Sequence, residues 1–194
     1  MDGSQTSTER ACAAISRGEV VGLPTDTLYG IAIDPFRRAS FATLYSVKQR
    51  SGDKAIPILV SGVEQAAEIV AVSEIGRSLI ERHWPGGLTL VLRRRRDVPV
   101  HIGDPVTGTV AVRAPDHPVA LDVLTRCGPL AVTSANVSGG QPARDAVEAR
   151  AALGDAVAVY LEGVTAAGTA STVVDATGDE PLVLRQGAVD IGAT

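Results

Sequence analysis

The chain contains few aromatic residues, and this scarcity restricts how its core is built. Aromatic residues make up 3% of the 194 residues, whereas hydrophobic residues make up 45%. The core must therefore consist mainly of Val, Leu, Ile and Ala side chains, which is typical of buried strands flanked by helices. A chain of this length is able to bury one substantial core, so we predict a single domain.

Cysteine and histidine are also scarce and widely spaced. Cys12 and Cys127 form no CxxC pair and no dense array, which argues against a disulfide framework or a zinc site. We predict that both are small core fillers in a reducing, cytoplasmic environment. His83, His101 and His117 show no paired-ligand spacing, so we expect no metal centre held by protein ligands.

Long apolar runs and the familiar nucleotide motifs are missing as well. No run reaches membrane-spanning length, and the polar start MDGSQTSTER has no signal-peptide core, so we expect a soluble, unexported protein with no membrane partner. GxxxxGK[ST], GxGxxG and GxSxG are absent. The net charge of -4 argues against a surface that grips nucleic acid as a whole, although a local basic groove stays open.

Helical and strand patterns alternate along the chain without a linker or repeat. They predict an α/β (α+β) domain over residues 1–194, with 1–7 as a loose tail and a twisted, mixed sheet flanked by helices. The expected helices are 7–18, 38–50, 63–72, 73–84, 117–128 and 144–154. The expected strands are 19–23, 55–61, 88–96, 107–115, 129–135, 156–162, 171–176 and 182–186.

Polar clusters follow several of the apolar runs. The stretch GLPTDTLYGIAIDP, residues 22–35, is one, and the others are Arg113 after TVAV, TSAN at 133–136 and Ser171 beside VVD. Ligands bind at strand ends in sheets of this kind, so the clusters predict a shared pocket. Loop capping by the same hydroxyl and carboxylate side chains is the alternative reading.

Two basic groups have both functional and ordinary explanations. Lys48 and Arg50 stand at a predicted helix end, where cations stabilise the helix dipole without any ligand. Arg93 to Arg96 are compatible with an RNA contact, but alternation along a strand would send successive side chains to opposite faces. A solvated strand end is the preferred interpretation of that run.

Seven segments occur in series between Glu19 and Val189: GLPTDTLYGIAID, LYSVKQR, WPGGLTLVL, TVAVRAPDHP, LAVTSANVSG, STVVD and LRQGAV. Their order and spacing resemble the YrdC-like family, the threonylcarbamoyl-AMP synthases. The resemblance implies a sheet curved around a basic, concave cavity in the short, single-domain form. It also implies a nucleotidyltransferase that joins L-threonine, bicarbonate and ATP into threonylcarbamoyl-AMP and releases pyrophosphate. The product would pass to transfer proteins that modify tRNA.

The same resemblance assigns roles to individual residues. Lys48 and Arg50 would be catalytic, because cations stabilise charge on the phosphoryl oxygens. Mg²⁺ would be carried with ATP and would need no protein cage. Threonine would be held by Thr27, Arg113 and Ser171. ATP would be held by Arg50, Lys54, Thr109, Ser134, Asn136 and Arg185, and Tyr29 would form a wall of the carbamate site.

The chain departs from the family pattern after KQR. Many relatives have a Pro and an Asn or His in the next strand, whereas SGDKAIPILVS supplies Lys54 and no His at its end. Two alternatives remain: a YrdC-like paralogue that binds RNA or hydrolyses the adenylate, and a double-stranded-RNA or tRNA-binding module. The chain keeps both the KxR and the SxN residues, which favours the synthase.

Overall fold

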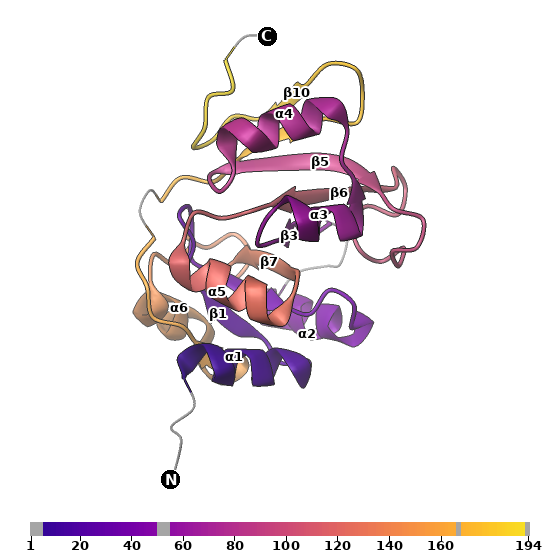
Figure 1. Ribbon diagram of the computed structural model, residues 1–194. Coiled ribbons are helices and arrows are strands. Elements are labelled where there is room, and N and C mark those ends of the chain that lie inside the picture. Colours follow the sequence, from indigo (N-terminus) through magenta and orange to yellow (C-terminus); the bar gives the residue numbers. More distant parts are fainter. Residues whose placement is uncertain (1–5, 50–54, 166–167, 193–194) are drawn as a thin grey trace.

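The computed structural model describes residues 6–49, 55–165 and 168–192 (Figure 1). Helices and strands alternate along these residues. The helices are α1 (Ser7–Ser16), α2 (Arg38–Lys48), α3 (Val63–Ile69), α4 (Glu74–His83), α5 (Pro118–Cys127) and α6 (Ala146–Leu153), with a 3-10 turn at Gly154–Ala156. The strands are β1 (Val21–Leu23), β2 (Gly30–Ile33), β3 (Ile58–Leu59), β4 (Val70–Ala71), β5 (Leu88–Arg94), β6 (Thr109–Arg113), β7 (Leu130–Ser134), β8 (Val159–Tyr160), β9 (Thr172–Asp175) and β10 (Leu182–Arg185).

The strands of the described residues form one ten-stranded sheet. Its order is β10-β9-β5-β6-β3-β7-β2-β1-β8, and β4 pairs with β5 outside this path. The pairs β1–β8, β3–β6 and β5–β9 are parallel, and the other pairs are antiparallel. The predicted mixed sheet flanked by helices is therefore confirmed.

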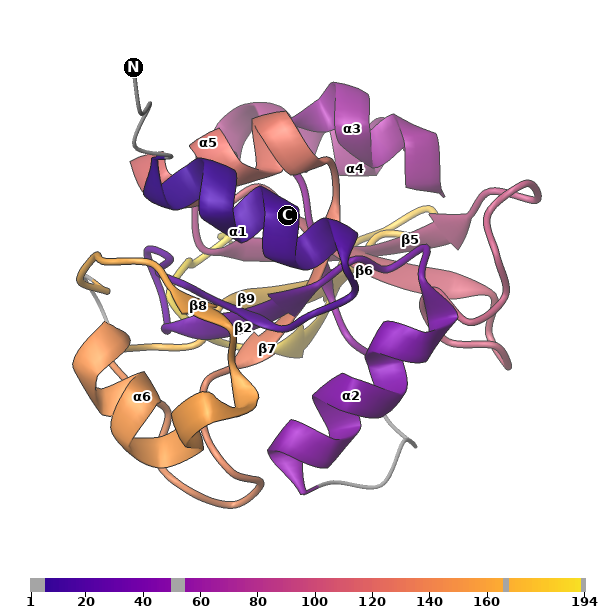
Figure 2. The same ribbon diagram turned by 90° about the horizontal axis from the view of Figure 1, so that it is seen from below.

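Apolar side chains pack in two clusters. The larger one includes alternate residues of β5, Leu88, Leu90 and Leu92, together with side chains from α2, α3, α4 and α6. The smaller one joins α1 and α5 to β1 and β7, and Figure 2 shows α1 and α5 on one side of the strands with α2 and α6 on the other. Since side chains alternate along a strand, Thr89 lies on the face of β5 that turns away from α3 and α4.

The first helix begins at Ser7, as expected, and Thr6 is its N-cap. The Thr6 hydroxyl accepts from the Glu9 amide at 3.2 Å, and the Glu9 carboxylate accepts from the Thr6 amide at 2.8 Å. This reciprocal capping box satisfies two amides that the first turn leaves open. Residues 6 and 7 thus belong to the helix start, and the loose tail expected over 1–7 is wrong for them.

Two elements differ from the sequence expectation. The helix expected over 63–72 ends at Ile69, because Val70 and Ala71 form β4 and pair with Arg94 and Arg93 of β5. The stretch Gly30–Ile33 was expected only as part of a pocket, yet it forms β2, an interior strand of the sheet between β1 and β7. Pairing with distant strands decides both cases.

The two cysteines form a disulfide, which corrects the prediction of separate core fillers. Cys12 of α1 and Cys127 of α5 are bonded, with 5.6 Å between their Cα atoms. The two helices pack side by side, so residues 115 positions apart in the sequence become neighbours. The cysteines consequently give no support to a reducing compartment, and a cytoplasmic location stays a prediction.

None of the described helices combines the length and the apolar character that a membrane crossing requires.

Candidate active site

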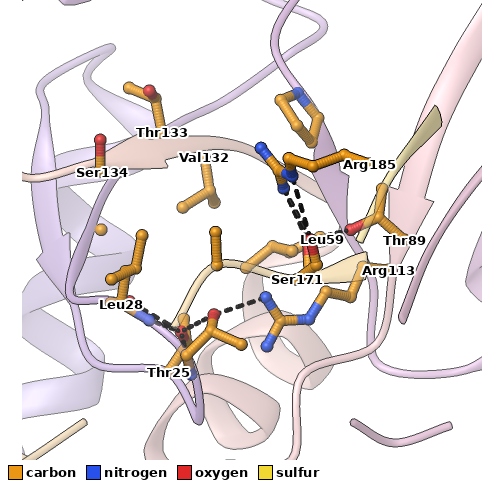
Figure 3. Close-up of a pocket in the computed structure, with 14 residues that line it drawn as sticks. Thr25, Leu28, Leu59, Thr89, Arg113, Val132, Thr133, Ser134, Ser171 and Arg185 are labelled. Atoms are coloured by element: carbon orange, nitrogen blue, oxygen red, sulfur yellow. Dashed lines mark hydrogen bonds between the residues drawn. The ribbon is translucent and has the colours of Figure 1, made fainter. Parts of the chain in front are cut away.

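A cavity of about 240 Å³ opens on the face of β5 and β6 that turns away from α3 and α4. Side chains from several strands and loops converge on it (Figure 3). Its described polar lining consists of Thr25, Thr27, Thr89, Thr133, Ser134, Ser171, Arg113 and Arg185. Both charged side chains of this lining are arginines, so the cavity suits an anionic group.

Arg113 is a buried cation in the cavity wall, with 5% of its surface exposed. Its Nε donates to the Gly86 carbonyl at 2.8 Å and its Nη1 donates to the Thr27 hydroxyl at 2.7 Å. Its Nη2 pairs with the Asp26 carboxylate. Burial lowers the pKa of Arg113, and the adjacent Asp26 carboxylate opposes that shift. The side chain is still always charged, so three partners hold a fixed cation in the wall.

A second cation, Arg185, lies on another side of the same cavity (Figure 3). Its Nη2 donates to the Ser171 carbonyl at 2.8 Å and to the Ser171 hydroxyl at 3.2 Å. The Ser171 hydroxyl is also 2.8 Å from the hydroxyl of Thr89. The strand end at Ser171 is thus tied to β5 on one side and to β10 on the other. The cavity brings together Thr27, Arg113, Ser134, Ser171 and Arg185, five of the predicted contact residues.

Lys48 and Asn136 meet beneath the turn that follows β7. The Lys48 ammonium donates to the Ser134 carbonyl at 2.7 Å and to Asn136 Oδ1 at 2.8 Å. Asn136 Oδ1 also accepts from the Ser134 hydroxyl at 2.6 Å, and Nδ2 donates to the carbonyls of Val137 and Gly140 at 3.0 and 2.6 Å. An amide offers two acceptor and two donor positions, and all four are used within the protein. Asn136 therefore fastens this turn to Lys48, and its expected contact with ATP stays a prediction.

Thr109 lies in a second hollow, whereas Ser134 and Arg185 line the main cavity, and its expected contact with the nucleotide stays a prediction. The second hollow has a volume of about 470 Å³, and Thr109, Ala111 and Asp175 are in its lining. The Thr109 hydroxyl is 2.8 Å from that of Thr107. Thr109 and Arg113 are four residues apart on β6 and hence share a face, so the two hollows lie along the same face of the sheet.

Tyr29 is part of the core and not of the cavity wall, which corrects its expected role beside the carbamate. Its side chain is fully buried, and its hydroxyl donates to the Leu161 carbonyl at 2.7 Å. Burial raises the pKa of Tyr29. Gly22 leaves room for this ring, because a Cβ atom there would lie 2.9 Å from the Tyr29 hydroxyl. Two other predicted contacts, Arg50 and Lys54, lie outside the described residues.

The arginine run 93–96, at the end of β5, does not form one basic surface. Arg93 lines the second hollow, whereas Arg94 donates to the carbonyls of Val100 and Ile102 at 3.2 Å. Arg95 forms an exposed ion pair with Asp97 at 3.1 Å. Successive side chains thus have different partners, which agrees with the preferred reading of a solvated strand end.

No cluster of three or more His, Cys, Asp or Glu side chains is placed to hold a metal ion among the residues that the structure describes.

The sequence of the chain matches a known protein family over most of its length. The Sua5/YciO/YrdC family model, described as telomere recombination, matches residues 13–187. The chain belongs to this family. It is 44% identical to a putative threonylcarbamoyl-AMP synthase of Mycobacterium tuberculosis over 181 residues, which are 92% of this chain and 83% of that protein. It is 32% identical to the threonylcarbamoyl-AMP synthase of Bacillus subtilis, covering 93% of this chain and 53% of that protein.

A solved structure of a Sua5/YciO/YrdC protein supports the same affiliation. The crystal structure of Pyrococcus abyssi Sua5 in complex with L-threonine has a TM-score of 0.85 and 31% identity to the chain. The match covers 95% of this chain and 55% of that one. The chain thus spans about half the length of that Sua5 protein.

Sequence reasoning missed several residues of this Sua5/YciO/YrdC site. Thr89 carried a readable signal, since it is a polar residue between Leu88 and Leu90 in an otherwise apolar strand, and alternation places it on the opposite face. Asp26 and Thr25 were seen as part of a polar cluster but received no role. The contact of Asp26 with Arg113 joins residues 87 positions apart, which no local pattern announces, whereas Thr25 contacts Thr27 within the same turn.

Proposed function

We propose that the protein is a threonylcarbamoyl-AMP synthase. It joins L-threonine, bicarbonate and ATP into threonylcarbamoyl-AMP with release of pyrophosphate. The observation that carries this proposal is the buried Arg113 guanidinium, held by Asp26, Thr27 and Gly86 in the wall of a cavity of amino-acid size. The names of the Mycobacterium tuberculosis and Bacillus subtilis relatives support it.

Arg113 is proposed to bind the threonine carboxylate. A guanidinium pairs with a carboxylate through two parallel N–H bonds, and Arg113 is already oriented by three partners. Thr27 and Ser171 flank it with hydroxyls. Leu28, Leu59 and Val132 provide apolar lining, which suits the threonine methyl group. Site residues and substrate thus match in charge, polarity and apolar surface.

The nucleotide is proposed to lie over the remaining polar lining. Ser134 and Arg185 line the main cavity and Thr109 lines the second hollow, so a nucleotide that follows the face of β6 would contact all three. Lys48 would contribute its charge from beneath the turn, together with Arg50, and Lys54 would add a further contact. Mg²⁺ would arrive bound to the ATP phosphates and water, where it neutralises their charge. Arginines in the cavity lining suit phosphates, not a bare metal ion.

The reaction proceeds in two steps. The threonine amine adds to carbon dioxide supplied by bicarbonate, and the proton that it loses combines with the hydroxide left behind to give water. A carbamate oxygen then attacks the α-phosphate in line, and pyrophosphate leaves. The adenylate would next pass to the proteins that transfer the threonylcarbamoyl group to tRNA.

Pyrophosphate release tests the proposal. We expect turnover with ATP, threonine and bicarbonate together, and loss of turnover when any one of them is omitted. Turnover that does not depend on threonine would contradict the synthase function. A tRNA-binding module would instead bind RNA without threonine, with an affinity that falls steeply as salt is raised.

A further inference from the structure

The two hollows follow two neighbouring rows of side chains on one face of the sheet. In the first row, Thr89 of β5 and Arg185 of β10 are paired with the same residue of β9, and both line the main cavity. In the second row, Val91 of β5 lies between Ala111 of β6 and Asp175 of β9, and all three line the second hollow. The rows are two residues apart along each strand, which is about 7 Å. The ribose of a nucleotide spans such a separation.

A bulge in β10 brings a leucine to this face. Consecutive residues of a regular strand point to opposite faces, yet Leu184 lines the second hollow while Arg185 lines the main cavity. The pairing of β10 with β9 shifts between Val183 and Arg185, and a shift of this kind re-aims a side chain. Leu184 is 54% exposed. The bulge therefore holds an apolar side chain at the hollow instead of in the core.

The two hollows also differ in charge. The described lining of the main cavity carries Arg113 and Arg185 and no carboxylate. The lining of the second hollow carries Asp104, Asp175 and Arg93. Phosphates favour the main cavity, because carboxylates would repel them. These charges would orient a bound nucleotide, with its phosphates in the main cavity and its base in the second hollow.

The second hollow offers a flat ring both apolar surface and a hydrogen-bond acceptor. Val91, Ala111 and Leu184 supply the apolar surface. Asp175 Oδ1 accepts from the Thr177 amide at 2.9 Å and from the Thr177 hydroxyl at 2.7 Å, and these two bonds orient the carboxylate. Both contacts within the described residues use Oδ1, so Oδ2 is left for a ligand. An ionised carboxylate only accepts, and the matching group is therefore an N–H donor at the edge of the ring.

An amino-bearing purine has this combination of a flat face and an N–H donor. We propose that the second hollow binds the adenine base of ATP, with the ring against Leu184 and the 6-amino group donating to Asp175 Oδ2. A 6-oxo group in the same place would set a second acceptor against the carboxylate, so Asp175 selects adenine over 6-oxopurines. This inference rests on the proposed function, since it names the residues that choose the nucleotide of the synthase.

The first experiment compares two nucleotides on the wild-type protein. ITP differs from ATP in that a 6-oxo group and an N1–H replace the 6-amino group, and calorimetry measures the affinity for each. We expect ATP to bind at least about tenfold more tightly, the effect of one hydrogen bond to a charged group. Equal affinities would overturn the inference. A clear preference for ATP without any threonine-dependent release of pyrophosphate would instead refute the proposed function and leave the base site standing.

The second experiment changes the acceptor. In Asp175→Asn the amide oxygen is able to keep the bonds from Thr177, which sets an NH₂ group in the place of Oδ2. This variant is expected to lose the preference for ATP over ITP. Asp190→Asn is a matched control that should keep the preference, because the Asp190 carboxylate also accepts from an amide two residues later, that of Gly192. If Asp175→Asn keeps the full preference, Asp175 only caps its own turn and the inference is wrong.

The third experiment removes the apolar wall. Leu184→Ala is expected to weaken the binding of ATP and of ITP alike, by about fivefold, because both purines present the same ring face. Leu182→Ala is the control: it makes the same change on β10 at a position that is 61% exposed and is not part of the described lining of the second hollow. Wild-type affinity of Leu184→Ala for both nucleotides would show that the base does not lie against this side chain.

Discussion

The Asp26–Arg113 pair is a buried ion pair in the wall of the site. The exposed fractions of the two side chains are 16% and 6%. Two charges that are removed from water in this way depend on each other, because either one alone would be buried without compensation. Each partner thus compensates the buried charge of the other within the proposed carboxylate site.

Removing one partner should therefore destabilise the fold. Asp26→Asn is expected to lower the free energy of unfolding by about 3 kcal/mol, since Arg113 loses its counter-charge. The double variant Asp26→Asn with Arg113→Gln should lose less than the sum of the single variants, by about 1 to 3 kcal/mol. Urea denaturation measures all three. Strict additivity would show that the pair is not coupled.

Asn136 gives a second prediction, which separates a fastening role from a nucleotide contact. Asn136→Ala removes the four side-chain hydrogen bonds that hold Lys48 and the turn. We expect the free energy of unfolding to fall by about 2 kcal/mol and turnover to fall with it. If Asn136→Ala has wild-type stability but binds ATP more weakly, Asn136 contacts ATP directly, as the resemblance to the family implies.

At the level of single residues, the sequence identifies chemical types better than contacts. Thr27, Arg113 and Ser171 were expected at one site, and the structure brings them to one cavity. Tyr29 was expected there too, but its ring fits the space above Gly22 in the core.

Among the elements, helices α1 and α5 are joined covalently as well as by packing. The Cys12–Cys127 bond closes a loop with a sequence separation of 115. A cross-link across so long a loop removes many conformations from the unfolded chain and stabilises the folded state relative to it.

Reduction should accordingly weaken the fold. Dithiothreitol is expected to lower the free energy of unfolding by about 2 to 4 kcal/mol, as should Cys12→Ser with Cys127→Ser. The double serine variant is the control, because dithiothreitol should not change it further. If reductant leaves the urea midpoint of the wild-type protein unchanged, the bond does not contribute as expected.

Strong periodic patterns predicted the long helices and strands, but two short strands were not predicted. The helix that ends at Lys48 and the strand that begins at Leu88 have clear periods of three to four and of two residues. β2 and β4 have four and two residues, too few to establish a period. Their existence depends on pairing with β7 and β5, which tertiary structure supplies.

For the whole molecule, the continuous face along β5 and β6 is the feature that unites the two hollows. Val91 and Ala111 are direct partners across these strands, and both line the second hollow, next to the positions of Thr89 and Arg113 in the main cavity. Because the Ala111 side chain is small, it does not project into the space between the main cavity and the second hollow.

A larger side chain at position 111 should weaken the binding of one substrate more than that of the other. Ala111→Phe is expected to weaken ATP binding about tenfold or more by overpacking the nucleotide path, while threonine binding changes less than about twofold. Calorimetry with each ligand alone measures both. Val106→Phe, at a position that is 91% exposed, is the control for adding an aromatic ring. Equal loss of both ligands in Ala111→Phe would mean that the sheet itself is disturbed.

The disulfide between α1 and α5 would hold the protein together after cleavage of the backbone between the two helices. The loop between β5 and β6 lies between Cys12 and Cys127 and carries the exposed Val100 and Val106. A protease that cleaves there would leave two fragments still bound through sulfur. Such a nicked molecule should migrate as one band on a denaturing gel without reductant and as two bands with it.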